Sequence, residues 1–136
     1  MAPDILHVDH IHLPVPDRNA AVEWYSKYLG FRVCEQLALW IDNEYAPLFL
    51  ENPSETVKLA LFKTDDFSPT SAIAFGCSGC EFMHWKRYLE EQELLQRVAN
   101  HEVCWSLYFQ DVAGNGIEIT SYDYEQLASE LASEST

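Results

Sequence analysis

The chain repeats one order of predicted elements in its two halves, and this repeat limits the possible folds more than any other feature. The first half is predicted to contain a strand, a helix and three strands, at 9–15, 18–29, 31–41, 47–50 and 57–62. The second half is predicted to contain a strand at 71–77, a helix from 78 to about 98, a weakly marked strand between 96 and 103, and strands at 102–109 and 117–122. Such a repeat predicts an α+β fold in which two modules pack together.

Short polar signals mark the ends of several elements. Asp17 can cap the first helix, and Gly30 can end it. Ser78 and Glu81 have the spacing of a capping box at the start of the second helix. The Asn-Gly pair at 115–116 predicts a hairpin turn before the last strand.

The predicted elements fit a single domain that covers residues 1–136. Module one is expected at about 5–63 and module two at about 71–123. The polar segment 63–71, which contains a proline, is the best candidate for a linker between them. A short C-terminal helix is expected at about 124–133.

The polar faces of the first and last predicted strands carry the candidate functional residues. In the first strand, His10 and His12 lie on the face opposite the apolar side chains. In the last strand, Glu118, Thr120 and Tyr122 share such a face. Strand geometry separates His10 from His12 by about 7 Å. If the two polar faces meet, their nitrogen and oxygen atoms form part of a metal site.

The charge of the chain excludes some classes of partner. Its net charge is −14, from 8 basic and 22 acidic residues, which argues against binding to nucleic acid or to an anionic membrane surface. The charge is compatible with a cationic ligand, although solvated helix faces explain it as well. Because the sequence has neither an apolar run long enough to span a membrane nor a secretory signal, a cytoplasmic location is expected.

The cysteines suggest an alternative that the rest of the sequence does not favour. Cys77 and Cys80 form a C-x-x-C pair between a strand and a helix, as in thioredoxin-like redox sites. That fold needs a cis-proline downstream of its cysteines, and all six prolines lie at or before Pro69. A zinc site is not favoured either, because there is only one such pair. The remaining histidines, His84, His101 and His7, are expected to be structural or on the surface.

Two segments resemble the vicinal oxygen chelate superfamily, which includes glyoxalases, bleomycin-resistance proteins and extradiol dioxygenases. They are D-H-I-H-L-P-V-P-D-R-N-A-A-V-E-W-Y-S-K-Y-L-G-F-R-V at 9–33 and Y-F-Q-D-V-A-G-N-G-I-E-I at 108–119. In the second segment Val112 and Ala113 replace the family's Pro and Asp. The resemblance implies two βαβββ modules that form a curved, barrel-like mixed sheet around a cavity, often in a homodimer.

The resemblance also implies a set of metal ligands that this chain retains only in part. The family's first imidazole ligand falls on His10 and its last carboxylate ligand on Glu118. The second imidazole position falls on Ala72 and a fourth position falls at about Leu59, and neither residue can coordinate a metal. With two ligands of the usual three or four, the site is expected to hold one divalent metal (Zn, Fe, Mn, Ni or Mg) weakly, or none if it is degenerate.

The resemblance leaves two functions in view, together with a third in which the domain is purely structural. In the first, the protein binds a small organic molecule in the sheet cavity, with His12, Thr120 and Tyr122 as ligand-binding residues. In the alternative, a metal on His10 and Glu118 activates adjacent substrate oxygens in a lyase or dioxygenase reaction. Aromatic side chains that can line the cavity are Trp40, Tyr45, Phe49, Trp105 and Tyr108.

Overall fold

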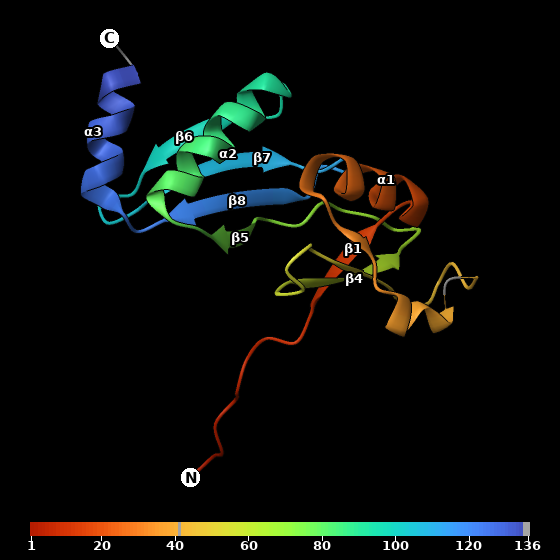
Figure 1. Ribbon diagram of the computed structural model, residues 1–136. Helices are drawn as coiled ribbons and strands as arrows, with labels where there is room; N and C mark the ends of the chain where they lie inside the picture. Colours follow the sequence, from red (N-terminus) through yellow and green to blue (C-terminus); the bar gives the residue numbers. More distant parts are fainter. Residues whose placement is uncertain (41, 135–136) are drawn as a thin grey trace. The chain divides into compact units, whose positions relative to one another are not determined.

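The computed structural model describes residues 1–40 and 42–134, apart from the side chains of Leu39 and Trp40, and it forms two compact units (Figure 1). The units are Met1–Thr70 and Ser71–Thr136, so the division falls near the end of the predicted linker. None of the described helices is long and apolar enough to cross a membrane. That both modules form a single domain stays a prediction.

The first unit is built on a four-stranded mixed sheet. Its elements are β1 (Ile11–Val15), α1 (Arg18–Leu29), β2 (Arg32–Val33), the 3-10 helix η1 (Glu35–Trp40), β3 (Leu48–Glu51) and β4 (Lys58–Lys63). The strand order is β1-β4-β3-β2, in which β1 is parallel to β4 and the other neighbours are antiparallel. Leu13 and Val15 are buried with Leu59 and Leu61, so the apolar face predicted for the first strand packs in the core.

The second unit has a four-stranded mixed sheet of the same topology. Its elements are β5 (Ile73–Gly76), α2 (Gly79–Glu91), β6 (Arg97–Asn100), β7 (Trp105–Gln110), β8 (Gly116–Ser121) and α3 (Tyr124–Glu134). The strand order is β5-β8-β7-β6, with β5 parallel to β8. Helix α2 lies against this sheet, and Phe82 and Leu89 of α2 are fully buried, as are Leu107 and Ile117 of the sheet (Figure 1).

The predicted α+β class and the two βαβββ modules are therefore confirmed. The described strands form two four-stranded sheets, one in each unit. Each described strand pairs only with strands of its own unit. Neither of these sheets is closed into a barrel. Each module alone thus contributes an open sheet with one apolar face covered by a helix.

The strand register identifies equivalent positions in the two modules. His12 of β1 pairs with Ala60 of β4, and Ala74 of β5 pairs with Glu118 of β8. His12 and Ala74 are each the second residue of their strand, so their partners Ala60 and Glu118 are equivalent positions. The sequence resemblance places the fourth ligand position one residue earlier, at about Leu59. Since an alanine and a leucine both lack a donor atom in the side chain, module one has no carboxylate ligand at this position.

The predicted helix caps form as expected. The Asp17 side chain accepts a hydrogen bond from the Ala20 backbone nitrogen at 3.2 Å, and Gly30 ends α1 with a φ of 71°. The Ser78 hydroxyl accepts one from the Glu81 backbone nitrogen at 3.2 Å. These contacts are local, so the sequence spacing was enough to predict them.

The strand predicted at 31–41 is wrong over most of its length. β2 covers only Arg32–Val33, and η1 follows it, while residue 41 lies outside the described residues. The Leu37 backbone nitrogen donates a hydrogen bond to the Cys34 carbonyl at 3.0 Å, which turns the chain away from the sheet. A short apolar segment fits either a strand or a helical turn, so its pattern does not distinguish them.

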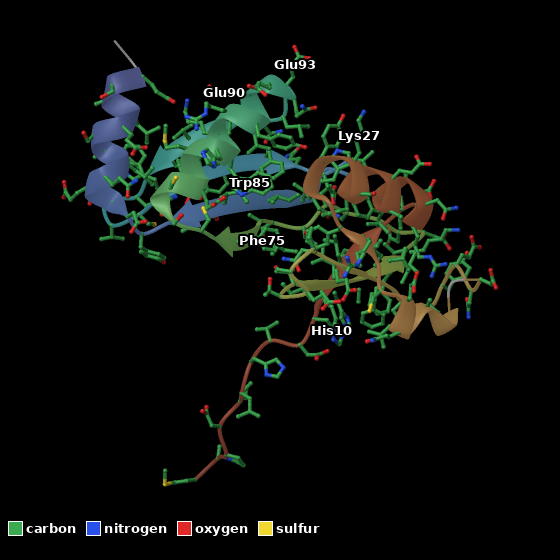
Figure 2. All side chains as sticks on the ribbon, viewed as in Figure 1. His10, Lys27, Phe75, Trp85, Glu90 and Glu93 are labelled. Atoms are coloured by element: carbon green, nitrogen blue, oxygen red, sulfur yellow. The ribbon has the colours of Figure 1, made fainter. Side chains whose placement is uncertain are left out.

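The second helix ends at Glu91, not at about 98 as predicted. Glu93 has a φ of 59°, and the Leu94 backbone nitrogen donates to the Leu89 carbonyl at 2.9 Å, so the chain reverses after α2 (Figure 2). β6 then pairs with β7 in the antiparallel direction. This stop carries no glycine or proline, which are the residues that usually mark a helix end in a sequence.

Candidate functional site

A polar face of the second sheet surrounds Glu118. The apolar residues of β8 are buried, and Glu118 and Thr120 alternate with them on the opposite face. The antiparallel register places Tyr108 opposite Glu118 and Ser106 opposite Thr120. We refer to Ser106, Tyr108, Glu118 and Thr120 as the Glu118 cluster.

Two hydroxyl groups hold the Glu118 carboxylate through one of its oxygens. Ser106 Oγ and Thr120 Oγ1 each donate a hydrogen bond to Glu118 Oε2 at 2.7 Å. The two hydroxyl oxygens are also 2.6 Å apart. Tyr108 also forms a side-chain hydrogen bond to this carboxylate, whose remaining lone pairs can accept a further hydrogen bond or bind a cation.

The environment of Glu118 favours its ionised form. Burial raises the pKa of Glu118, but hydrogen bonds from Ser106, Thr120 and Tyr108, together with nearby His101, outweigh it and hold the pKa below the ordinary value. Because the folded-state pKa is lowered, these contacts stabilise the fold above the ordinary glutamate pKa. The stabilisation is lost as the pH falls through the lowered value.

The cluster extends across β7 to residues whose role the sequence did not predict. His101 Nε2 lies 3.0 Å from the Tyr108 hydroxyl, and Arg97 Cζ lies 4.4 Å from the centre of the Tyr108 ring. Arg97 pairs with Tyr108 in the register between β6 and β7. No functional role was predicted from the sequence for Ser106, Arg97 or His101. Only Ser106 could have been found from the sequence, since it lies two residues before Tyr108 in one predicted strand and therefore shares its face.

Thr120 and Tyr122, both predicted to bind ligand, lie in different surroundings. Thr120 is within the cluster, whereas Tyr122 follows the last residue of β8 and is 75% exposed. Just after it, the Tyr124 backbone nitrogen donates to the Tyr122 carbonyl at 2.8 Å, so the chain turns toward α3. Among the described residues, the Tyr122 side chain makes no hydrogen bond to the cluster.

The first unit brings His10 and His12 together more closely than strand spacing implies. His10 lies immediately before β1 (Figure 2), and its Nε2 atom is 3.2 Å from His12 Nε2. The two rings stack with centroids 5.1 Å apart and an angle of 19° between their planes. On the other side of its ring, His10 Nδ1 is 2.8 Å from Asp9 Oδ2. We refer to His10 and His12 as the histidine pair.

The aromatic residues predicted to line a cavity are distributed over several environments. Phe49 packs edge-on against His10 at 5.2 Å, and Tyr108 belongs to the Glu118 cluster. The Tyr45 hydroxyl donates to Asp65 at 3.2 Å, and Trp105 Nε1 donates to a backbone carbonyl of α3 at 3.3 Å. The side chain of Trp40 lies outside the described residues.

The donor atoms of the two units suit a divalent metal only in part. Within residues 1–40 and 42–134, no three His, Cys, Asp or Glu side chains form a group that could hold a metal ion. The first unit offers two imidazoles and the second a carboxylate, while a catalytic zinc or non-haem iron site usually has three protein ligands. That His10 and Glu118 share one metal stays a prediction, since they belong to different units.

The C-x-x-C pair does not have the environment of a reactive thiol site. Both Cys77 and Cys80 are free thiols. Burial, with the carboxylates of Glu81 and Asp123, raises the pKa of the Cys77 thiol to about 11. Reactive cysteines have a lowered pKa, so Cys77 is in the opposite situation.

Comparisons with known proteins place these features in a family context. The family described as the Glyoxalase/Bleomycin resistance protein/Dioxygenase superfamily matches residues 7–119. The comparison with curated proteins gave no significant match.

Similar solved structures include three with the same fold. An integron cassette protein from the mobile metagenome of the Halifax Harbour sewage outfall has 20% identity and a TM-score of 0.71, covering 86% of this chain and 99% of its own. A glyoxalase/dioxygenase from Nostoc punctiforme has 22% identity and a TM-score of 0.62, covering 90% and 99%. A lactoylglutathione lyase from Agrobacterium tumefaciens has 18% identity and a TM-score of 0.66, covering 85% and 92%. At these identities the likeness concerns the fold alone.

Proposed function

The chain belongs to the glyoxalase/bleomycin resistance protein/dioxygenase superfamily, and we propose that it binds a small organic molecule on the polar face around Glu118. The observation that carries this proposal is the ionised carboxylate of Glu118, held through Oε2 by Ser106 and Thr120. The remaining lone pairs of this carboxylate can accept a hydrogen bond from a ligand. Carboxylates with a shifted pKa on a polar surface are enriched at functional sites.

The groups beside Glu118 indicate what kind of molecule would bind. Glu118 accepts hydrogen bonds, so the ligand carries an N–H, O–H or cationic group. His101 and Arg97 flank Tyr108 and can donate to a ligand oxygen. The Tyr108 ring offers an apolar surface between them. A polar molecule with a donor group and an acceptor oxygen a few ångströms apart fits this arrangement.

Glu118→Gln should weaken the binding of such a molecule by at least about tenfold, because a hydrogen bond to a charged group contributes about 1.5–3 kcal/mol. We suggest screening small amino alcohols and hydroxy acids by amide chemical-shift changes in the isotope-labelled protein. The largest amide chemical-shift changes should occur at Ser106, Tyr108 and Thr120. Glu125→Gln, at an exposed position of α3, is the matched control and should leave the affinity unchanged. Binding that is equally strong in both variants would contradict the proposal.

A metal-dependent lyase or dioxygenase is the second candidate, and two observations favour it. Glu118 is in the ionised form that ligates metals, and Asp9 engages the Nδ1 side of His10 and leaves its Nε2 for coordination. A bound divalent metal would polarise two adjacent substrate oxygens. Metal content measured after purification without a chelator or a metal-binding tag tests this candidate. Loss of the metal in Glu118→Gln would support it, and a wild type that takes up no divalent metal even when the metal is added back would contradict it.

Restoring the missing imidazole should strengthen metal binding. Ala72 is exposed and lies beside Gly116, on the face of the second sheet that carries Glu118. Ala72→His therefore adds a second ligand near that carboxylate, and the affinity for Zn²⁺ should rise by at least about tenfold. Titration calorimetry with Zn²⁺ measures it. Ala132→His adds a histidine to α3 as a control, and an equal gain there would mean that the position of the imidazole is irrelevant.

We also propose that the protein acts as a homodimer in the cytoplasm, binds a small molecule, and contacts neither nucleic acid nor membranes. Dimers are frequent in the family that the sequence resembles, and the net charge of −14 opposes contact with nucleic acid or anionic membranes. Sedimentation equilibrium of the full chain tests the dimer. A single species of 15.6 kDa at all concentrations would contradict it.

A further inference from the structure

The histidine pair has the geometry of two ligands around one metal ion. Zinc binds imidazole nitrogen at about 2.0–2.1 Å. The distance of 3.2 Å between His10 Nε2 and His12 Nε2 then corresponds to an angle of about 100° at the metal, between octahedral and tetrahedral values. An ion can therefore fit between the two nitrogens without moving either ring far.

Neighbouring side chains hold the pair in this arrangement. Phe49 packs edge-on against His10 with ring centres 5.2 Å apart, and Phe62 packs against His12 at 4.6 Å. Both phenylalanines come from strands of the same sheet as β1, so the whole arrangement lies within the first unit. Ligands that are held in place before the metal arrives lose less conformational entropy on binding.

Asp9 selects the tautomer of His10 that a metal needs. When His10 Nδ1 donates its proton to Asp9 Oδ2 at 2.8 Å, His10 Nε2 carries a lone pair. A carboxylate that accepts from the outer nitrogen of a metal-bound histidine is a recurrent feature of zinc sites. In the absence of a metal, the same lone pair accepts a hydrogen bond from His12 Nε2.

We propose that His12 is a metal ligand together with His10, and that Zn²⁺ or a similar borderline divalent cation binds between their Nε2 atoms. This proposal deepens the metal-dependent candidate function and rests on it. In this proposal His12, from module one, supplies the second imidazole. The position of the family's second imidazole, in module two, is occupied by Ala72, which cannot coordinate a metal. Imidazole pairs select zinc, nickel and copper over magnesium and calcium, which narrows the metals that this chain would use.

Zn²⁺ titration of the metal-free full chain, followed through the imidazole nitrogen resonances, tests the proposal. Both Nε2 signals of the histidine pair should move together at one equivalent. His12→Ala should weaken Zn²⁺ binding by at least about tenfold, whereas His84→Ala, at an exposed position of α2, should not change it. Asp9→Asn should weaken binding to a smaller extent, because it removes the charge that orients His10.

The outcomes separate this inference from the candidate function on which it rests. If Zn²⁺ moves only the His10 signal and His12→Ala binds as the wild type does, His12 is not a ligand, although His10 and Glu118 can still share a metal. If Zn²⁺ binds the histidine pair equally in the wild type and in Glu118→Gln, the pair is a metal site and the shared site with Glu118 is wrong. If Zn²⁺ moves neither signal, the inference is overturned and small-molecule binding at Glu118 is unaffected.

Discussion

Replacing Asp111 by alanine is expected to lower the free energy of unfolding by about 3 kcal/mol. Asp111 Oδ1 accepts hydrogen bonds from the backbone nitrogens of Ala113 and Asn115, each at 2.9 Å. Its Oδ2 accepts a third from Asn115 Nδ2 at 3.2 Å. Asp111 is 6% exposed and Asn115 is fully buried. Alanine would leave these donors without their acceptor in a place that water does not easily reach.

Urea denaturation followed by circular dichroism measures this loss. Asp111→Asn keeps one acceptor oxygen for the backbone donors but places its amide against that of Asn115, so we expect an intermediate loss. Asp66→Ala, the same change at an exposed position, should alter the unfolding free energy by less than about 0.5 kcal/mol. Equal effects of Asp111→Ala and Asp66→Ala would show that the turn before β8 does not depend on this carboxylate.

Cys77 is expected to react with iodoacetamide about 100-fold more slowly than glutathione at pH 8. Its pKa is raised from 9.0 to about 11 by burial and by the carboxylates of Glu81 and Asp123. At a pH below both values, two pKa units reduce the thiolate fraction about 100-fold, and the thiolate is the reactive form. Its rate should therefore still be rising with pH above pH 10.

The measurement needs a chain in which only one thiol of the C-x-x-C pair can react. In Cys80→Ser, alkylation of Cys77 can be followed by mass spectrometry of the peptide that contains it. Cys77→Ser is the reciprocal control, in which the exposed Cys80 should react faster. If Cys77 reacted as fast as glutathione, its surroundings would not raise the pKa of the thiol, and a redox role of the pair would have to be considered again.

Asp123 links this thiol to the packing of α2 on α3. Its carboxylate accepts a hydrogen bond from the Gly79 backbone nitrogen at 2.6 Å, at the start of α2. A Cβ atom on Gly79 would lie 2.9 Å from Gln126 Oε1 and 3.0 Å from Asp123 Cβ. Close packing therefore favours glycine at position 79, between the two cysteines. A structural role thus accounts for the C-x-x-C segment without redox chemistry.

The sequence by itself determined the features that depend on neighbours along the chain. The bounds of α1 match the prediction because Asp17 and Gly30 act on the helix through local hydrogen bonds. Thr120 lies beside Glu118 because residues two apart in a strand share a face. The repeat of a strand, a helix and further strands has the same origin, since alternation and helical spacing are local patterns.

Only the tertiary structure decided which side chains from distant segments meet. Ser106 reaches Glu118 through the register of β7 and β8, and no local pattern specifies a register. Asp123 helps to raise the pKa of the Cys77 thiol although the two residues are 46 positions apart in the sequence. α2 stops at Glu91 because the chain reverses and β6 pairs with β7. In each case a burial or pairing energy that arises only in the folded chain outweighs the local preference.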